Sequence, residues 1–100
     1  MSEIVHAVLL QLRTEAAPAD VDAAFAAARR IPDQIEGVRE VVAGPDVSVE
    51  GLTDGLTHGV IVRFADSAAR ERYLAHPAHE ALGALMGPLI ERAVVVDVAV

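Results

Sequence analysis

The sequence predicts a single α+β domain over residues 1–100, with strands and helices in the order β-α-β-β-α-β. Three observations lead to this fold class. Apolar residues form four strand-like runs, two segments repeat apolar residues at helical spacing, and Gly and Pro mark the breaks. Hydrophobic residues make up 53% of the chain, above the usual ~45–50%. In so small a domain we expect that surplus to be buried at a subunit interface.

Each element is predicted from its apolar pattern and its end signals. The first strand is apolar on both faces, which predicts cover on both sides. The helices open with Pro, Asp or Ser, as helix N-termini favour. His76-Pro77 interrupts the second helix, because a residue before proline disfavours the α region. The predicted elements are a strand at 3–12, a helix at 18–30, a turn at 33–36, a strand at 38–43 with Gly44-Pro45 as a bend or its end, a Gly-rich loop at 47–56, a strand at 57–65, a helix at 67–75 that resumes at 77–86, and a strand at 93–100.

This order is the ferredoxin-like arrangement, in which four strands form one antiparallel-type sheet and the helices cover one face. The opposite face is apolar, and we expect face-to-face packing with a second copy to bury it, which gives a homodimer. On the first strand, Val5, Ala7 and Leu9 should lie on that helix-free face. The residues that should point toward the helices are His6, Val8, Leu10, His58 and Val60.

Composition excludes several classes of function. The formal net charge is -7, and without a basic patch the chain is not expected to bind nucleic acid. Its apolar runs fall far short of the ~20 residues of a membrane span, and no basic leader precedes a long apolar run. We therefore expect neither membrane binding nor a signal peptide. The absence of cysteine fits a reducing cytoplasm.

Two of the four histidines occupy predicted strands. His6 lies on an apolar face, where an unpaired imidazole would be costly. His58 opens the third strand, beside the first, so the two rings could be neighbours. Asp97 lies among valines in the last strand and needs a partner, which a histidine or the Thr57 region could supply. The simplest interpretation is that His6 and His58 are buried polar residues satisfied by each other, by Asp97 or by water.

The helix break at His76-Pro77 points to a second pair of candidate residues, Tyr73 and His79. If Pro77 is the first helical residue, His79 lies in the first turn, where the helix-end potential favours a neutral ring. Such an imidazole could act as a general base, and Tyr73 across the break could hold a developing oxyanion. The alternative is a Tyr–His hydrogen bond that only fixes the break, with His76 as an N-cap or surface residue.

The sequence predicts no metal and no cofactor. His76 and His79 have a metal-pair spacing, but zinc needs a third or fourth ligand, and no cysteine or placed carboxylate supplies it. No phosphate-binding loop, nucleophile elbow or dinucleotide fingerprint is present.

Together these residues resemble the stress-responsive A/B barrel family over essentially the whole chain. The resemblance is carried by His6, by Gly55-Leu56-Thr57-His58, by the Tyr-x-x-His-Pro-x-His run from Tyr73 to His79, and by Val94-Val95-Val96-Asp97. It implies a dimeric α+β barrel. Most family members have no established activity, and some are stress-induced stability proteins in plants.

The resemblance also implies a site. In a plant cyclase of this family, which closes a linear tetraketide by aldol condensation, the working tyrosine and histidine fall on Tyr73 and His79. Its other two pocket histidines fall on His6 and His58. Ala24 and Ile90 stand here where that enzyme has bulky aromatic residues, so the pocket shape is not carried over.

Three hypotheses follow. The first is a dimeric family member that binds a small hydrophobic ligand between sheet and helices, in a pocket lined by His6, Val8, Leu10, His58, Val60 and Asp97. The second is a cofactor-independent cyclase acting on a polyketide-like substrate, with His79 as base and Tyr73 as oxyanion donor. The third is a purely structural stress protein. A cavity of ~300 Å³ or more that reaches both Tyr73 and His79 would favour the enzyme.

Overall fold

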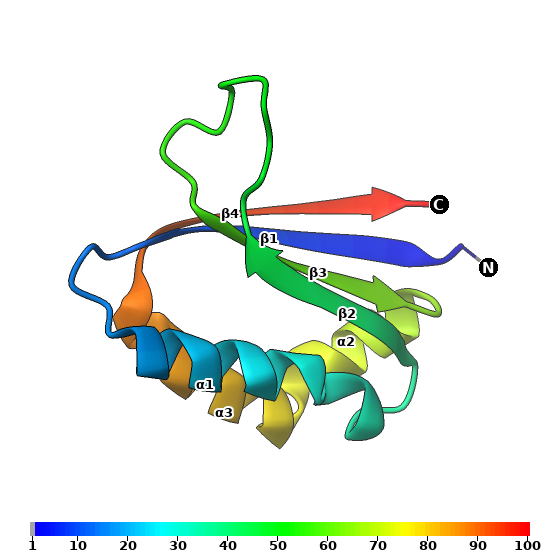
Figure 1. Ribbon diagram of the computed structural model, residues 1–100. Coiled ribbons are helices and arrows are strands. Elements are labelled where there is room, and N and C mark those ends of the chain that lie inside the picture. The colour runs from blue at the N-terminus through cyan, green and yellow to red at the C-terminus, as the bar shows by residue number, and fades with distance from the viewer. Residues whose placement is uncertain (1) are drawn as a thin grey trace.

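The computed structural model describes residues 2–100 and confirms the α+β fold (Figure 1). Its helices and strands alternate in the predicted order. They are β1 (Ile4–Leu12), α1 (Pro18–Arg29), the 3₁₀ turn η1 (Ile31–Asp33), β2 (Val38–Pro45), β3 (His58–Phe64), α2 (Ser67–Ala75), α3 (Pro77–Met86), the 3₁₀ turn η2 (Gly87–Leu89) and β4 (Ile90–Ala99). No helix within residues 2–100 has the length and apolar character needed to cross a membrane.

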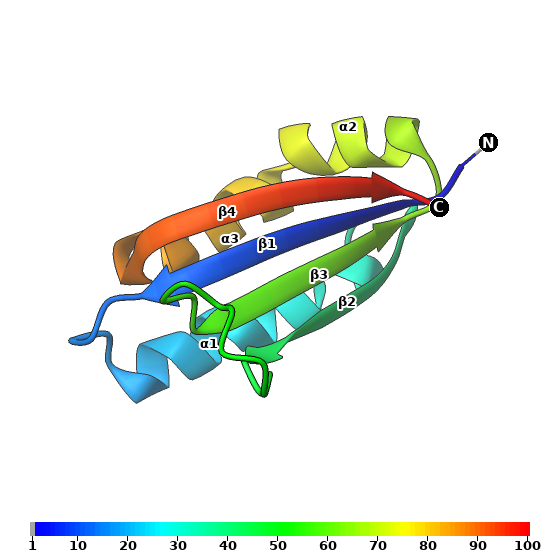
Figure 2. The same cartoon turned by 90° about the horizontal axis from the view of Figure 1, so that it is seen from above.

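The four strands form one antiparallel sheet in the order β2-β3-β1-β4. All three helices lie on one face of it, as Figures 1 and 2 show, and the other face carries no helix. Within the sheet, β1 is flanked by β3 and β4, while β2 and β4 are the edges. This is the ferredoxin-like topology that the sequence predicted.

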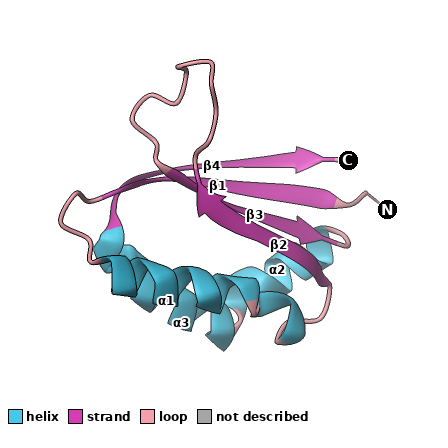
Figure 3. Cartoon of the chain, viewed as in Figure 1, coloured by secondary structure: helices cyan, strands magenta, loops and turns pink. Residues whose placement is uncertain are grey.

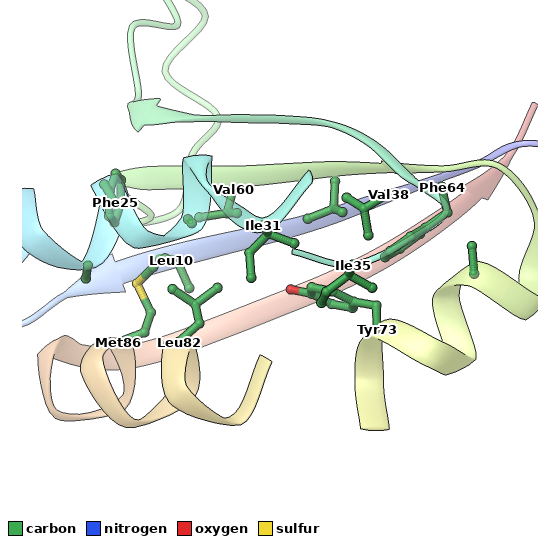
Figure 4. Packing of buried hydrophobic residues seen from close by; sticks show 14 of the residues in the cluster. Leu10, Phe25, Ile31, Ile35, Val38, Val60, Phe64, Tyr73, Leu82 and Met86 are labelled. Carbon is green, nitrogen blue, oxygen red and sulfur yellow. The ribbon is translucent and has the colours of Figure 1, made fainter. Parts of the chain in front are cut away.

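The core lies between the sheet and the helices (Figure 4). The largest fully buried side chains are Leu10, Val62 and Phe64 from the sheet, and Ile31 and Ile35 from the segment that follows α1. Each such side chain contributes about 1.5–3 kcal/mol through burial. Residues directly opposite in an antiparallel pair share a face, so the pairs Val8↔Val60 and Leu10↔His58 place those side chains on the helix side. The predicted facing of β1 and β3 is therefore confirmed.

Two strands are longer than the sequence predicted. β2 continues through Gly44 and Pro45, which pair with Gly59 and His58. Because β2 is an edge strand, a proline there costs no interior hydrogen bond. β4 begins at Ile90 rather than at 93, because η2 leads directly into the sheet, where Ile90 pairs with Leu12.

The helix-free face is apolar and largely uncovered. Val42, Val96 and Val98 are each about half exposed there. Residues 46–57, which connect β2 to β3, stand away from the sheet on this same side (Figures 1 and 3). We call this segment the arm.

Candidate functional site

The break between α2 and α3 positions the candidate site. Asp66 caps α2 by accepting a hydrogen bond from the Ala69 amide at 2.9 Å. His76 ends α2 in an extended conformation and caps α3, since its Nδ1 accepts from the Ala78 amide at 2.9 Å. Pro77 is then the first residue of α3, where its missing N–H costs nothing. His76 is therefore an N-cap, and His79 lies in the first turn, as predicted.

Tyr73 and His79 pack against each other across this break. Their ring centroids are 4.5 Å apart with an interplanar angle of 55°. Within residues 2–100 no hydrogen bond joins them, so the caps and not a Tyr–His bond hold the break. Tyr73 is 3% exposed. Its hydroxyl points into the layer between helices and sheet (Figure 4) and finds no hydrogen-bond partner among the described residues, although the oxygen is not completely enclosed.

Burial sets the protonation of both side chains. Loss of solvent lowers the pKa of His79, an effect larger than the opposing one of the Leu74 backbone, and nearby His6 lowers it further. Burial raises the pKa of Tyr73. At neutral pH the pair therefore consists of a neutral imidazole beside a neutral phenol. The sequence analysis expected a neutral His79 from its place at the helix end, and burial of the ring acts in the same direction.

On the sheet side, Asp97 joins His6 to Arg70. The Asp97 Oδ1 lies 2.5 Å from His6 Nδ1, and Arg70 Nη1 donates to Oδ2 at 3.0 Å. Burial alone would raise the pKa of Asp97, but the hydrogen bonds and charges of His6 and Arg70 outweigh it and lower that pKa. The His6 ring in turn lies 6.0 Å, edge-on, from that of Tyr73. The expectation that a histidine supplies the partner of Asp97 is confirmed.

Arg70 contacts Asp97, and the sequence analysis did not single it out. It lies three positions before Tyr73 on α2, a spacing that puts two side chains on the same face of a helix. That spacing is the signal that could have found it.

His58 lies outside this group, so the prediction that the His6 and His58 rings are neighbours is wrong. The register explains why: His6 pairs with Val62, whereas His58 lies four residues before Val62 in β3, opposite Leu10. At ~3.4 Å per residue the two histidines are about 14 Å apart along the strand direction. The His58 ring instead meets Phe25 edge-on at 5.3 Å, and its Nδ1 lies 2.9 Å from Thr57 Oγ1.

A ligand could approach His6, Asp97 and Tyr73 from the β4 edge of the sheet. Val95 shares the helix-side face with Asp97, since it lies two residues earlier on the strand. It is nevertheless 55% exposed, because the helices do not cover this part of β4. Neither the cavity of about 710 Å³ nor the one of about 200 Å³ is lined by Tyr73 or His79, so neither is the cavity that would favour the enzyme. The larger, about 710 Å³, lies between the arm and the helix-free face. Within residues 2–100 no three His, Asp or Glu residues form a metal-binding group.

Comparison with known proteins places this geometry in a family. Residues 4–100 match the Stress responsive A/B Barrel Domain. Over 94 residues the chain is 26% identical to a stress-response A/B barrel domain-containing protein of Arabidopsis thaliana, covering 94% of this chain and 86% of that one. It is also 26% identical over 94 residues to olivetolic acid cyclase of Cannabis sativa, covering 94% and 93%.

A solved structure gives the same result for the fold. A dimeric ferredoxin-like protein of unknown function from Jannaschia superposes with a TM-score of 0.88 at 25% identity, covering 98% of this chain and 99% of that one. Sequence and structure thus agree over nearly the full length. The chain belongs to the stress-responsive A/B barrel domain family.

Proposed function

We propose that the protein works as a homodimer that binds a small, largely apolar ligand between sheet and helices. The observation that carries the ligand site is the uncovered helix side of β4, where half-exposed Val95 adjoins the His6–Asp97 pair. Ligand sites usually consist of an apolar wall with a few polar groups. Tyr73 and His79 would then contact the ligand from the helix side, while Val8 and its neighbour Val60 contribute to the sheet side. Leu10 and His58 pair with each other four residues from His6, too far along the sheet to share that contact.

The homodimer is supported by the helix-free face. It presents exposed Val42, Val96 and Val98, and apolar patches of this kind usually mark an interface. The Jannaschia relative is described as dimeric. Light scattering should give a mass near twice 10.5 kDa. A stable monomer at micromolar concentration would contradict the homodimer. If the wild type is dimeric, the Val96→Glu variant should show an equilibrium shifted toward monomer.

The ligand site can be tested without knowing the natural ligand. Titration of ¹⁵N-labelled protein with acetophenone and its longer alkyl homologues should shift the amide signals of His6, Tyr73, His79 and Val95, with affinity rising as the alkyl chain grows. Shifts confined to the helix-free face, or an affinity independent of alkyl length, would place the apolar binding surface elsewhere.

A second function is favoured by the Tyr73–His79 contact and by the similarity to a cyclase. Neutral His79 would remove a proton from a carbon next to a carbonyl, and the Tyr73 hydroxyl would donate a hydrogen bond to the enolate oxygen. The enolate carbon would attack a second carbonyl of the same molecule, forming a carbon–carbon bond. The proton on His79 would then pass to the resulting alkoxide, so the reaction needs no cofactor.

Deuterium exchange tests the first step of this chemistry. In D₂O the protein should accelerate exchange at the central carbon of a β-diketone such as acetylacetone, followed by ¹H NMR. His79→Gln should abolish the acceleration, and Tyr73→Phe should reduce it about 100-fold, as for loss of one oxyanion donor. His58→Asn is the matched control and should exchange at the wild-type rate. Exchange undiminished in His79→Gln would remove His79 as the base.

The cytoplasmic location of the protein stays a prediction.

A further inference from the structure

The arm carries apolar side chains that nothing in the chain covers. Val47, Val49 and Leu52 are 85%, 96% and 80% exposed. They lie on a connection of twelve residues that projects from the helix-free face rather than folding back onto it (Figure 1). Exposed apolar residues on a projecting loop indicate a contact with another surface.

The base of the arm is held in place by hydrogen bonds. The Asp46 amide donates to the Thr57 carbonyl at 2.8 Å, which closes the hairpin at its root. Arg92 of β4 donates from Nη2 to the Asp54 carbonyl, and the Leu56 amide donates to the Thr53 carbonyl at 3.0 Å. The arm is therefore tied to the sheet at its base while its tip remains free.

The groove of about 710 Å³ lies between this arm and the sheet. Its floor is made by Leu9, Val42 and Ile61, which belong to the helix-free face, and its wall includes Leu52 and Leu56 of the arm. The groove is thus continuous with the surface that the homodimer would bury. A second sheet packed on this face would enter the groove.

The arm is long enough to pass the partner's sheet. Two packed sheets lie ~10 Å apart, and half of a twelve-residue loop can extend up to about 20 Å. Edge strand β4 offers a target, because its helix-free face carries Val96 and Val98. Both valines are about half exposed. An apolar edge of this kind requires cover.

We propose that each arm clasps the second copy of the chain. Apolar side chains of the partner's helix-free face fill the groove at the base, and Val49 and Leu52 lie against the partner's β4. A two-fold axis makes the same contact twice, so the two arms lock the dimer together. This inference rests on the proposed homodimer.

Excision of the arm tests the clasp. Because Asp46 and Thr57 are already hydrogen-bonded, replacing residues 47–56 with Asn-Gly leaves a two-residue hairpin loop. Sedimentation equilibrium should show at least a tenfold weaker dimer for the excised chain and for Val49→Glu/Leu52→Glu. Leu85→Glu, an exposed leucine on α3, is the matched control and should dimerise as the wild type does.

Photo-crosslinking locates the contact. A benzophenone amino acid at position 52 should give a product of twice the chain mass, and mass spectrometry should map it to the peptide containing β4. The same group at position 85 should give no such product. A monomeric wild type would refute the homodimer itself. A dimeric wild type whose affinity survives excision, or cross-links only within one chain, overturns the clasp alone and leaves the groove to a small ligand.

Discussion

Replacing Asp97 with Asn removes the charge between His6 and Arg70 while keeping the size of the side chain. Asp97 now meets His6 at 2.5 Å and Arg70 at 3.0 Å, one with each oxygen. An Asn side chain can still accept from Arg70 with its oxygen, but its amide then meets His6 only as a neutral donor, so neither contact keeps the charge of the carboxylate. The variant therefore tests whether the Asp97 carboxylate stabilises the fold around the site.

The size of the effect follows from burial. His6 is 7% exposed, so water does not substitute for the carboxylate, and a hydrogen bond to a charged group contributes about 1.5–3 kcal/mol. The side chains of Arg70 and Asp97 are 27% and 30% exposed, and such a pair contributes only about 0.2–1 kcal/mol. We expect Asp97→Asn to lower the free energy of unfolding by about 2 kcal/mol, and Arg70→Gln by less than about 1 kcal/mol.

Urea denaturation at fixed protein concentration measures this difference, because dimerisation would otherwise change the apparent stability. The folded-state pKa of Asp97 is lowered from its ordinary value of 3.8. Its contribution is therefore fully present above pH 3.8 and is lost as the pH falls through the lower, folded-state pKa. Equal stability of variant and wild type at pH 7, or a gap unchanged down to the lowest pH at which the protein stays folded, would refute the reasoning.

The remaining predictions concern His79, two glycines and the cap of α2. Because the pKa of His79 is lowered from 6.5 in the folded state, wild-type stability should fall as the pH drops below 6.5. Urea denaturation should show no such fall for His79→Gln. Parallel plots of stability against pH for the two proteins would contradict this. Gly37→Ala should cost about 3 kcal/mol, since φ is +92° and the new Cβ would lie 2.6 Å from the Ala69 Cβ, whereas Gly44→Ala, with open space around it, should change thermal stability by less than about 1 kcal/mol. Asp66→Ala removes the α2 cap and should cost about 1 kcal/mol in the same melts; no change would mean that the cap is not needed.

Local signals were sufficient for most of the fold. The Asp66 cap and the His76-Pro77 break act within one helical turn, so the sequence predicted both ends of α2 and the start of α3. Local signals left the end of β2 open. Gly44 and Pro45 read locally either as a bend or as the end of the strand, and pairing with β3 shows that they end the strand. Tertiary pairing decides what local preference leaves open at such positions.

The candidate site was predicted where its members are close in sequence or lie on strands that the fold makes neighbours. The meeting of Tyr73 and His79 follows from the break between them, and the His6–Asp97 pair follows from the adjacency of the first and last strands. His58 was misplaced because strand adjacency does not give register, and four residues of register separate it from His6. Arg70 reaches Asp97 from another layer of the fold, which strand patterns do not report.

The His6–Asp97 pair has a consequence for the order of folding. The two residues are 91 positions apart, and contacts of such long sequence separation form slowly because the loop between them must first be closed. During synthesis, β4 leaves the ribosome after every element it packs against, so His6 stays without its carboxylate until the last strand docks. The site is therefore completed at the end of folding, and a chain that stops short of β4 would expose the β1 edge to pairing with other chains.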